Sequence, residues 1–226
     1  TVIKTDANNT GKTTITQEKG ADEERQIVVK SENANDSISI GDTTVTTTKP
    51  NTQIILNENE EEIILGAGSV DLEEGSKIQL PNGNVVMNPE KKEGETGSYP
   101  SIGVDANGDV TVPNGGVAKI ETADGNQVEV SVPAETPPNL PSKVVVDEDG
   151  NTSVQTPAGN KVVIGGEQYE VGDFETKFEM DDEGNVIVAD GNVVLGPGQS
   201  IVDSNGTEYK NTGTEPIDIL MSENGP

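Results

Sequence analysis

The chain has 226 residues and carries 41 acidic side chains against 14 basic ones, for a formal charge of -27. Such a charge repels nucleic-acid phosphates and anionic lipid headgroups, so neither is an expected partner. The chain contains no His and no Cys, which excludes nucleophilic triads in their usual form, the common zinc sites and disulfides. No stretch approaches the roughly 18 consecutive apolar residues of a membrane span, so membrane insertion is not expected.

Residues 1–25 are expected to form a loosely ordered or strand-exchanged arm. From residue 26 to residue 100 we predict an N-terminal β region, which contains the short apolar runs QIVVK, TQIILN and EEIILG. Uninterrupted apolar runs of this length are typical of strands that are buried on both faces. The region is expected to end in an exposed loop or linker, NPEKKEGETGSYPS, at residues 88–101.

Residues 101–221 are predicted to form a C-terminal β-repeat region, followed by a frayed tail at residues 222–226. NQVEVSV places Val128, Val130 and Val132 on one face of a strand, and TKFEM does the same with Phe178 and Met180. KVVV and KVVI resemble the fully apolar runs of the N-terminal region. The Pro-rich stretch PAETPPNLP at residues 133–141 cannot pair as a central strand.

An acidic phrase recurs along the chain and begins at Val70, Val104, Val146 and Met180, at intervals of 34, 42 and 34 residues. Each copy consists of a turn, a short strand, a second turn and a second short strand, which is the signature of stacked repeats. No window of ten residues has helical periodicity, because Gly and Pro interrupt every candidate. The sequence therefore predicts an all-β protein.

Two all-β architectures fit these short strands. Aromatic residues make up 2% of the chain and Trp is absent, so the core must be built from Val, Ile and Leu. Thin cores of this kind suit a β-solenoid or β-helix-like stack, in which each repeat is buried by its neighbours. Tandem β-sandwiches are the alternative, although such domains usually contain an aromatic anchor in the core.

The acidic phrases raise the question of calcium binding. A helix-loop-helix calcium loop requires Gly at position 6 and Glu at position 12, but counting from Asp105 places Val110 and Gly116 there. Asp followed by Gly between two strands is explained by turn formation, so we expect no cofactor. Calcium at a corner stays open as the alternative, and its candidate ligands are Asp105, Asn107, Asp109, Asp147, Asp149, Asp181 and Asp182.

No catalytic residue can be assigned from the sequence. Acidic side chains are too numerous for any pair to be selected as the acids of a glycosidase. Lys143, Lys161 and Lys177 stand at strand starts or on strand faces, as do the lysines that form isopeptide bonds with Asn in some surface domains. An exposed Lys on a strand edge is the simpler interpretation of each.

The phrases DANGDVTVPNGG, TADGNQVEVSVP and DEDGNTSVQTPAGNKVVI resemble degenerate repeats in large surface proteins of gut Firmicutes. The resemblance covers roughly residues 70–220 and rests on the turn and strand pattern of the repeats. Those proteins have no assigned activity. The resemblance implies an extracellular or cell-wall-associated protein with a stalk or display role, and it assigns no functional residue.

These observations predict a non-enzymatic structural or adhesion segment of a bacterial cell-surface or secreted protein. Its expected partner is a component of a host or neighbouring-cell surface. One alternative is a carbohydrate-binding or carbohydrate-cleaving β-helix, which would need a groove lined by Asp together with Tyr169 or Tyr209. A second alternative is a homo-oligomer, namely a trimeric phage or adhesin fibre whose thin core is shared between chains.

Overall fold

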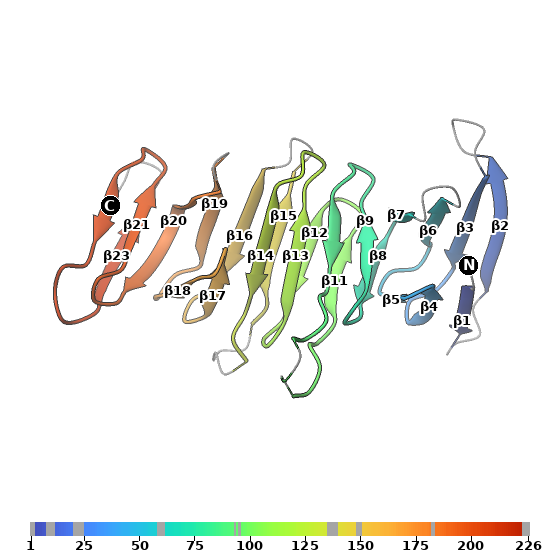
Figure 1. Cartoon of the computed structure of the whole chain (residues 1–226), viewed down its shortest axis with the longest axis horizontal. Helices are drawn as coiled ribbons and strands as arrows, with labels where there is room; N and C mark the ends of the chain where they lie inside the picture. Colours follow the sequence, from blue (N-terminus) through green and yellow to red (C-terminus); the bar gives the residue numbers. More distant parts are fainter. Residues whose placement is uncertain are drawn as a thin grey trace. The chain divides into compact units, whose positions relative to one another are not determined.

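The structure is a computed structural model. It describes residues 3–7, 12–19, 25–57, 62–92, 94, 96–134, 140–147, 151–181 and 184–222. These residues form 23 β-strands and no helix (Figure 1), which confirms the all-β prediction. The described part of the chain therefore contains no helix that is long and apolar enough to span a membrane.

The chain divides into two compact units. The first comprises Thr1–Val110 and Ala118–Gly125, and the second comprises Thr111–Val117 and Asn126–Pro226. Strand β12 (Asp109–Val112) is thereby shared between the units, and the division falls beyond the boundary at residue 100 that the sequence suggested.

The first unit contains two sheets, here named A and B. Where the structure describes their strands, neighbours are antiparallel apart from the single parallel pair Ile64–Gln79. In sheet A the order is β1 (Ile3–Ala7), β4 (Asp36–Ile40), β5 (Thr43–Thr47), β8 (Ser69–Leu72) and β11 (Ile102–Asp105). In sheet B it is β2 (Thr13–Lys19), β3 (Arg25–Ser31), β6 (Thr52–Asn57), β7 (Glu62–Ala67), β9 (Lys77–Gln79), β10 (Val85–Met87) and β13 (Val117–Glu121). Strands β1 and β2 fall within the segment for which the sequence suggested a loosely ordered arm.

The second unit repeats this two-sheet arrangement, and the one parallel pairing among its described residues joins β20 to β21. Sheet A contains β15 (Ser142–Val146), β16 (Thr152–Thr156), β19 (Thr176–Met180), the first half of β20 (Val186–Leu195), β21 (Ser200–Asp203) and β22 (Glu208–Lys210). Sheet B contains β14 (Gln127–Ser131), β17 (Lys161–Ile164), β18 (Glu167–Val171), the second half of β20 and β23 (Ile217–Met221). Successive hairpins of the chain, such as β15–β16 and β17–β18, thus enter the two sheets alternately.

Most strands bury one face and leave the other partly exposed, in contrast to the prediction for the apolar runs. In QIVVK, Val29 is buried while Ile27 and Val28 are partly exposed, and in KVVV the outward Val145 is likewise partly exposed. The prediction of strands buried on both faces is therefore wrong. The physical reason is that these antiparallel sheets are covered on one side only, so β-branched residues also occupy the outer face.

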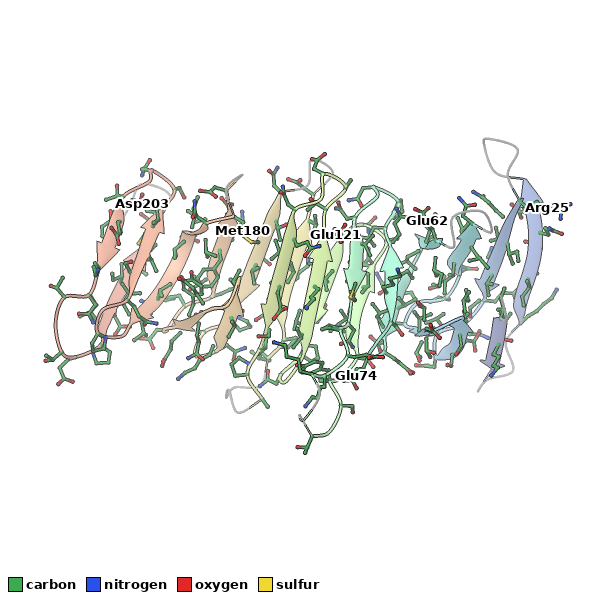
Figure 2. All side chains as sticks on the ribbon, in the orientation of Figure 1. Arg25, Glu62, Glu74, Glu121, Met180 and Asp203 are labelled. Atoms are coloured by element: carbon green, nitrogen blue, oxygen red, sulfur yellow. The ribbon has the colours of Figure 1, made fainter. Side chains whose placement is uncertain are left out.

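The buried faces of the two sheets meet in the second unit. Tyr169 on β18 of sheet B lies against Phe178 on β19 of sheet A, with ring centroids 5.1 Å apart and ring planes inclined by 47°. The remaining buried apolar side chains are almost all Val, Ile or Leu, which confirms the predicted composition of the core. Acidic side chains are carried by strands as well as by turns, such as Glu62 on β7 and Glu121 on β13 (Figure 2).

Buried asparagines hold the corners where the chain leaves one sheet for the other. In the second unit the side-chain amides of Asn160, Asn192 and Asn211 donate to backbone carbonyls of Leu140, Ile219 and Leu195 at 2.6, 3.2 and 2.9 Å. In the first unit Asn88 donates in the same way to Leu72. A corner exposes backbone groups that no sheet ladder can satisfy, and these amides bond to them.

Strand β20 turns such a corner without interruption. Its first half pairs with β19 up to Asp190, and from Gly191 onward it pairs with β23. Gly191 has a φ of 115°, a backbone conformation that residues with a Cβ rarely adopt. A Cβ at this position would lie 2.5 Å from the carbonyl oxygen of Glu175 and 2.5 Å from the Cα of Thr176.

Candidate functional site

The acidic turns that suggested calcium use their carboxylates to close their own loops. The two oxygens of Asp147 accept hydrogen bonds from the backbone and side-chain nitrogens of Asn151, at 2.8 and 2.9 Å. Asp181 bonds to Asn185 with the same two distances. Such bonds are typical of Asp in tight turns. Asp149 and Asp182 lie outside the described residues.

The third acidic turn carries an ion pair that the sequence did not predict. One oxygen of Asp105 accepts a hydrogen bond from the backbone nitrogen of Asn107, and the other lies 2.7 Å from the ammonium group of Lys49, which is 56 residues away in the chain. Burial by itself would raise the pKa of Asp105, but the hydrogen bonds from Lys49 and Asn107 and the charge of Lys49 together lower that pKa below its usual value. Asp109 also acts electrostatically on Lys49. A lysine cation therefore already pairs with the Asp105 carboxylate of this turn.

In the residues that the structure describes, no three acidic side chains come together as a group that could hold a metal ion. Asp105, Asp147 and Asp181 belong to three separate turns, so the structure does not bring the candidate ligands of different repeats to one point. Calcium binding at an individual turn stays a prediction that requires a direct measurement.

We expect calcium to leave the melting temperature unchanged beyond the effect of magnesium at equal ionic strength. A calcium ion would have to displace the hydrogen bonds that Asn151 and Asn185 already make to Asp147 and Asp181. A thermal melt with millimolar calcium, with magnesium and with a chelator makes the comparison. Saturation at about 100 times the dissociation constant would add roughly 2.7 kcal/mol of stability, so a calcium-specific rise of several degrees would contradict the turn interpretation.

Replacing Lys49 with Met is expected to destabilise the chain at pH 7 and to have a smaller effect near pH 2. The folded-state pKa of Asp105 is lowered, so its stabilisation is present above the unfolded-state pKa of about 3.9 and disappears as the pH falls through the lower folded-state value. Urea unfolding at several pH values measures the difference. Lys77→Met removes the same charge from another exposed lysine. Its difference in stability from the wild type should not shrink between pH 7 and pH 2 as that of Lys49→Met does.

The lysines considered for isopeptide bonds lie on outer faces of the sheets. Lys161 pairs with Glu170 at 3.1 Å and Lys177 pairs with Glu179 at 2.5 Å, and all four side chains are close to half exposed. Lys143 lies on β15 with its side chain partly exposed. Isopeptide formation requires a buried apolar pocket, and these exposed pairs across and along the strands do not supply one.

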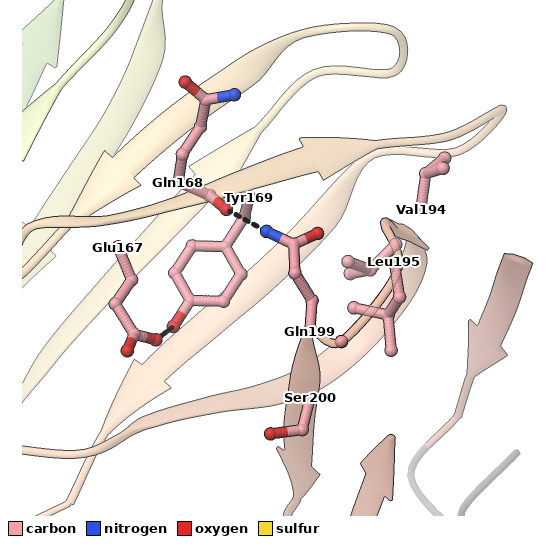
Figure 3. A pocket seen from close by; sticks show the side chains of 9 residues that line it. Glu167, Gln168, Tyr169, Val194, Leu195, Gln199 and Ser200 are labelled. Carbon is pink, nitrogen blue, oxygen red and sulfur yellow. Dashed lines mark hydrogen bonds between the residues drawn. The ribbon is translucent and has the colours of Figure 1, made fainter. Parts of the chain in front are cut away.

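The second unit contains a pocket of about 390 Å³, shown in Figure 3. It lies between β18, the second half of β20 and the turn that precedes β21, and its polar lining includes Glu167, Tyr169, Gln199 and Ser200. The Tyr169 hydroxyl donates to a carboxylate oxygen of Glu167 at 3.1 Å. Gln199 donates to the backbone carbonyl of Gln168 at 3.5 Å and accepts from the backbone nitrogen of Gly196 at 2.7 Å.

The lining of this pocket can offer hydrogen bonds, and its tyrosine is held in a neutral form. Burial, and then the hydrogen bond and charge of Glu167, raise the pKa of Tyr169 well above its usual value, so the phenol keeps its proton to a higher pH than an ordinary tyrosine. The Tyr169 ring is 7% exposed and packs on Phe178, and it is therefore unable to act as a flat platform for a sugar. Tyr209, the other aromatic residue considered for sugar binding, donates its hydroxyl to Asp203 at 3.1 Å.

Comparisons of the chain with protein-family models, with curated proteins and with solved structures found no match. Function has to be inferred from the residues themselves. Three features of the site were not predicted from the sequence, namely the partner of Asp105, the contact between Tyr169 and Phe178, and the position of Gln199. Each joins residues of different strands or turns, and no local pattern signals such a pairing.

Proposed function

We propose that this chain is a non-enzymatic structural segment of a secreted or cell-wall-attached bacterial protein, where it serves as a stalk or display repeat. The observation that carries the proposal is the use of the repeated residues. The acidic side chains of the repeats bond within their own turns, as in the pairs Asp147–Asn151 and Asp181–Asn185. The alternate apolar residues are buried between two sheets. The needs of the fold itself thus explain why these residue types recur at the repeated positions.

We further propose that the strands form a solenoid-like stack. Its support is the alternation of hairpins between two sheets within each unit, together with a core of Val, Ile and Leu that needs only local burial. Small-angle X-ray scattering tests the stack, because a compact domain of this length has a radius of gyration of about 17 Å. The proposal expects a clearly larger value, and a value near that of a single compact domain would contradict the stack.

The proposed absence of enzymatic activity is supported by the missing His and Cys, which removes the usual nucleophilic triads. A screen against glycans, peptides, esters and phosphoesters tests this part of the proposal, with heat-denatured protein as the control. Any catalytic activity that co-purifies with the folded chain would overturn the proposed absence of enzymatic activity. Labelling of intact cells with an antibody against the chain tests the proposed surface location.

A further inference from the structure

The pocket in Figure 3 forms where two paired strands of sheet B separate. β18 pairs with β20 through Glu170 and Val171, and the residues at the start of β18 lie beyond the last pairing. β20 ends at Leu195, after which the chain turns and enters β21 in sheet A. The volume of the resulting gap, about 390 Å³, lies within the roughly 300–1,000 Å³ of small-molecule sites. Since β18 and β20 each pair with a further strand on the opposite side, the pocket is not a free sheet edge.

The pocket combines buried apolar residues with an exposed polar rim. Tyr169, Val193 and Leu195 line it and are buried. Glu167 and Gln199 also line it and are exposed. A ligand with an alkyl stem and a polar head can therefore place the stem against the buried residues and keep the head at the rim.

The rim presents hydrogen-bond acceptors that the described residues use only in part. One carboxylate oxygen of Glu167 accepts from the Tyr169 hydroxyl at 3.1 Å, which orients the group and leaves its second oxygen for a ligand. The backbone carbonyl of Gln168 accepts from the Gln199 amide at 3.5 Å, a distance at which a hydrogen bond is weak. Of the nine lining residues Glu167 is the one that is acidic, and none is basic. The rim is therefore suited to a donor with a positive charge.

The turn before β21 is fixed by bonds of its own. The backbone nitrogen of Gly196 donates to the side-chain oxygen of Gln199 at 2.7 Å, and the backbone nitrogen of Gly198 donates to the carbonyl of Asn211 at 2.8 Å. Both bonds exist without a ligand. Because little has to be ordered on binding, even a small ligand can bind measurably.

Other classes of ligand fit this lining less well. An anion would be repelled by Glu167 and by the net charge of -27. A sugar would need an open aromatic face, and the ring of Tyr169 is buried. Calcium takes six to eight oxygen ligands, usually with several carboxylates, whereas the pocket has one. Lys210 opposes Ser200 on the neighbouring strand but does not line the pocket, so a ligand has to supply the cation.

We propose that this pocket binds a primary alkylammonium ion. The ammonium group donates to the carboxylate of Glu167 and to the carbonyl of Gln168, and the alkyl stem packs on Val193 and Leu195. A free amine and a lysine side chain of another protein share this chemistry. The site gives the chain a ligand, which goes beyond the proposed structural function and does not depend on it.

Titration of the ¹⁵N-labelled full chain with n-butylammonium, followed by NMR, tests the proposal. We expect chemical-shift changes confined to the amides of residues 167–169 and 198–200, with a dissociation constant on the order of 1 mM. The neutral n-butanol and potassium ions at equal concentration should not produce them. N-acetyl-lysine methylamide distinguishes the two sources of the ligand. Binding of both amines identifies a lysine side chain, and binding of n-butylammonium alone identifies a free amine.

Three variants separate a built site from the general attraction of an acidic chain for cations. Glu167→Gln should weaken binding of n-butylammonium by about three- to tenfold, because it removes the charge that pairs with the ammonium group. Tyr169→Phe keeps the ring against Phe178 but releases the carboxylate, and should weaken binding by about two- to tenfold. Glu175→Gln is the matched control, since Glu175 is exposed in the same unit and does not line the pocket. It should bind like the wild type.

Circular dichroism must show that the three variants are folded. The proposal would be overturned by the absence of localised shifts at millimolar amine, by equal shifts with n-butanol or potassium, or by a loss of affinity in Glu175→Gln as large as that in Glu167→Gln. Any of these results would remove the ligand site and leave the structural function standing, because scattering and the activity screen test that function separately.

Discussion

Replacing Phe178 with Ala is expected to lower the free energy of unfolding by about 3–5 kcal/mol. Phe178 is 1% exposed and its ring meets that of Tyr169 across the two sheets of the second unit. The loss combines the transfer of a large apolar side chain with the cavity that it leaves. Urea unfolding followed by tyrosine fluorescence and circular dichroism measures the change.

Phe174→Ala is the matched control for this substitution. Phe174 lies two residues before the start of β19 and is 59% exposed, so its removal should change stability by no more than about 0.5 kcal/mol. If Phe178→Ala were as mild as Phe174→Ala, the face-to-face packing of sheets A and B at this point would be wrong.

Replacing Gly191 with Ala is expected to destabilise the chain strongly, because the change combines backbone strain with a steric conflict. A residue with a Cβ at this positive φ adds about 1–3 kcal/mol of backbone strain. The new Cβ would also lie 2.5 Å from backbone atoms of Glu175 and Thr176, and displacing packed atoms costs a further ~1–3 kcal/mol. The corner at which β20 passes from sheet A to sheet B should therefore open at lower urea concentration. Hydrogen exchange of the β20 amides would locate the effect.

Gly198→Ala separates the two contributions. Gly198 also has a positive φ, of 82°, but a Cβ there meets nothing within 4 Å, so only the backbone strain remains. The difference between the two variants then measures the steric conflict at the β20 corner. Equal losses for both would show that the close approach of Thr176 to Gly191 is not present in solution.

Much of the fold follows from the sequence because its signals are local. The alternation of NQVEVSV and TKFEM predicts strands, and both are observed as β14 and β19. The Asp and Gly of the repeats predict turns, and Asp147 and Asp181 close theirs with bonds to residues four positions away. The scarcity of aromatic residues predicts a core of Val, Ile and Leu, which the structure confirms. Each of these properties depends on neighbours within a few residues.

The exposure of the apolar runs could not be inferred in the same way. QIVVK and KVVV are apolar at successive positions, and sequence periodicity does not distinguish a strand covered on both faces from one with β-branched residues on an open face. The number of sheet layers decides between these two kinds of strand. Each unit has two sheets, so each sheet is covered on one side only. Likewise, the arm expected at residues 1–25 contains β1 and β2, because distant strands β4 and β3 provide their partners.

By itself the sequence determined that the chain is built of short strands, that its acidic repeats are turns, and that its core is aliphatic, because those properties arise from backbone preference and side-chain type. Only the tertiary structure decided that Lys49 neutralises Asp105, that Tyr169 meets Phe178, and that Asn160 and Asn192 hold the corners. Those contacts join residues brought together by the alternation of hairpins between two sheets. Strand pairing sets them, and strand pairing depends on residues far apart in the chain.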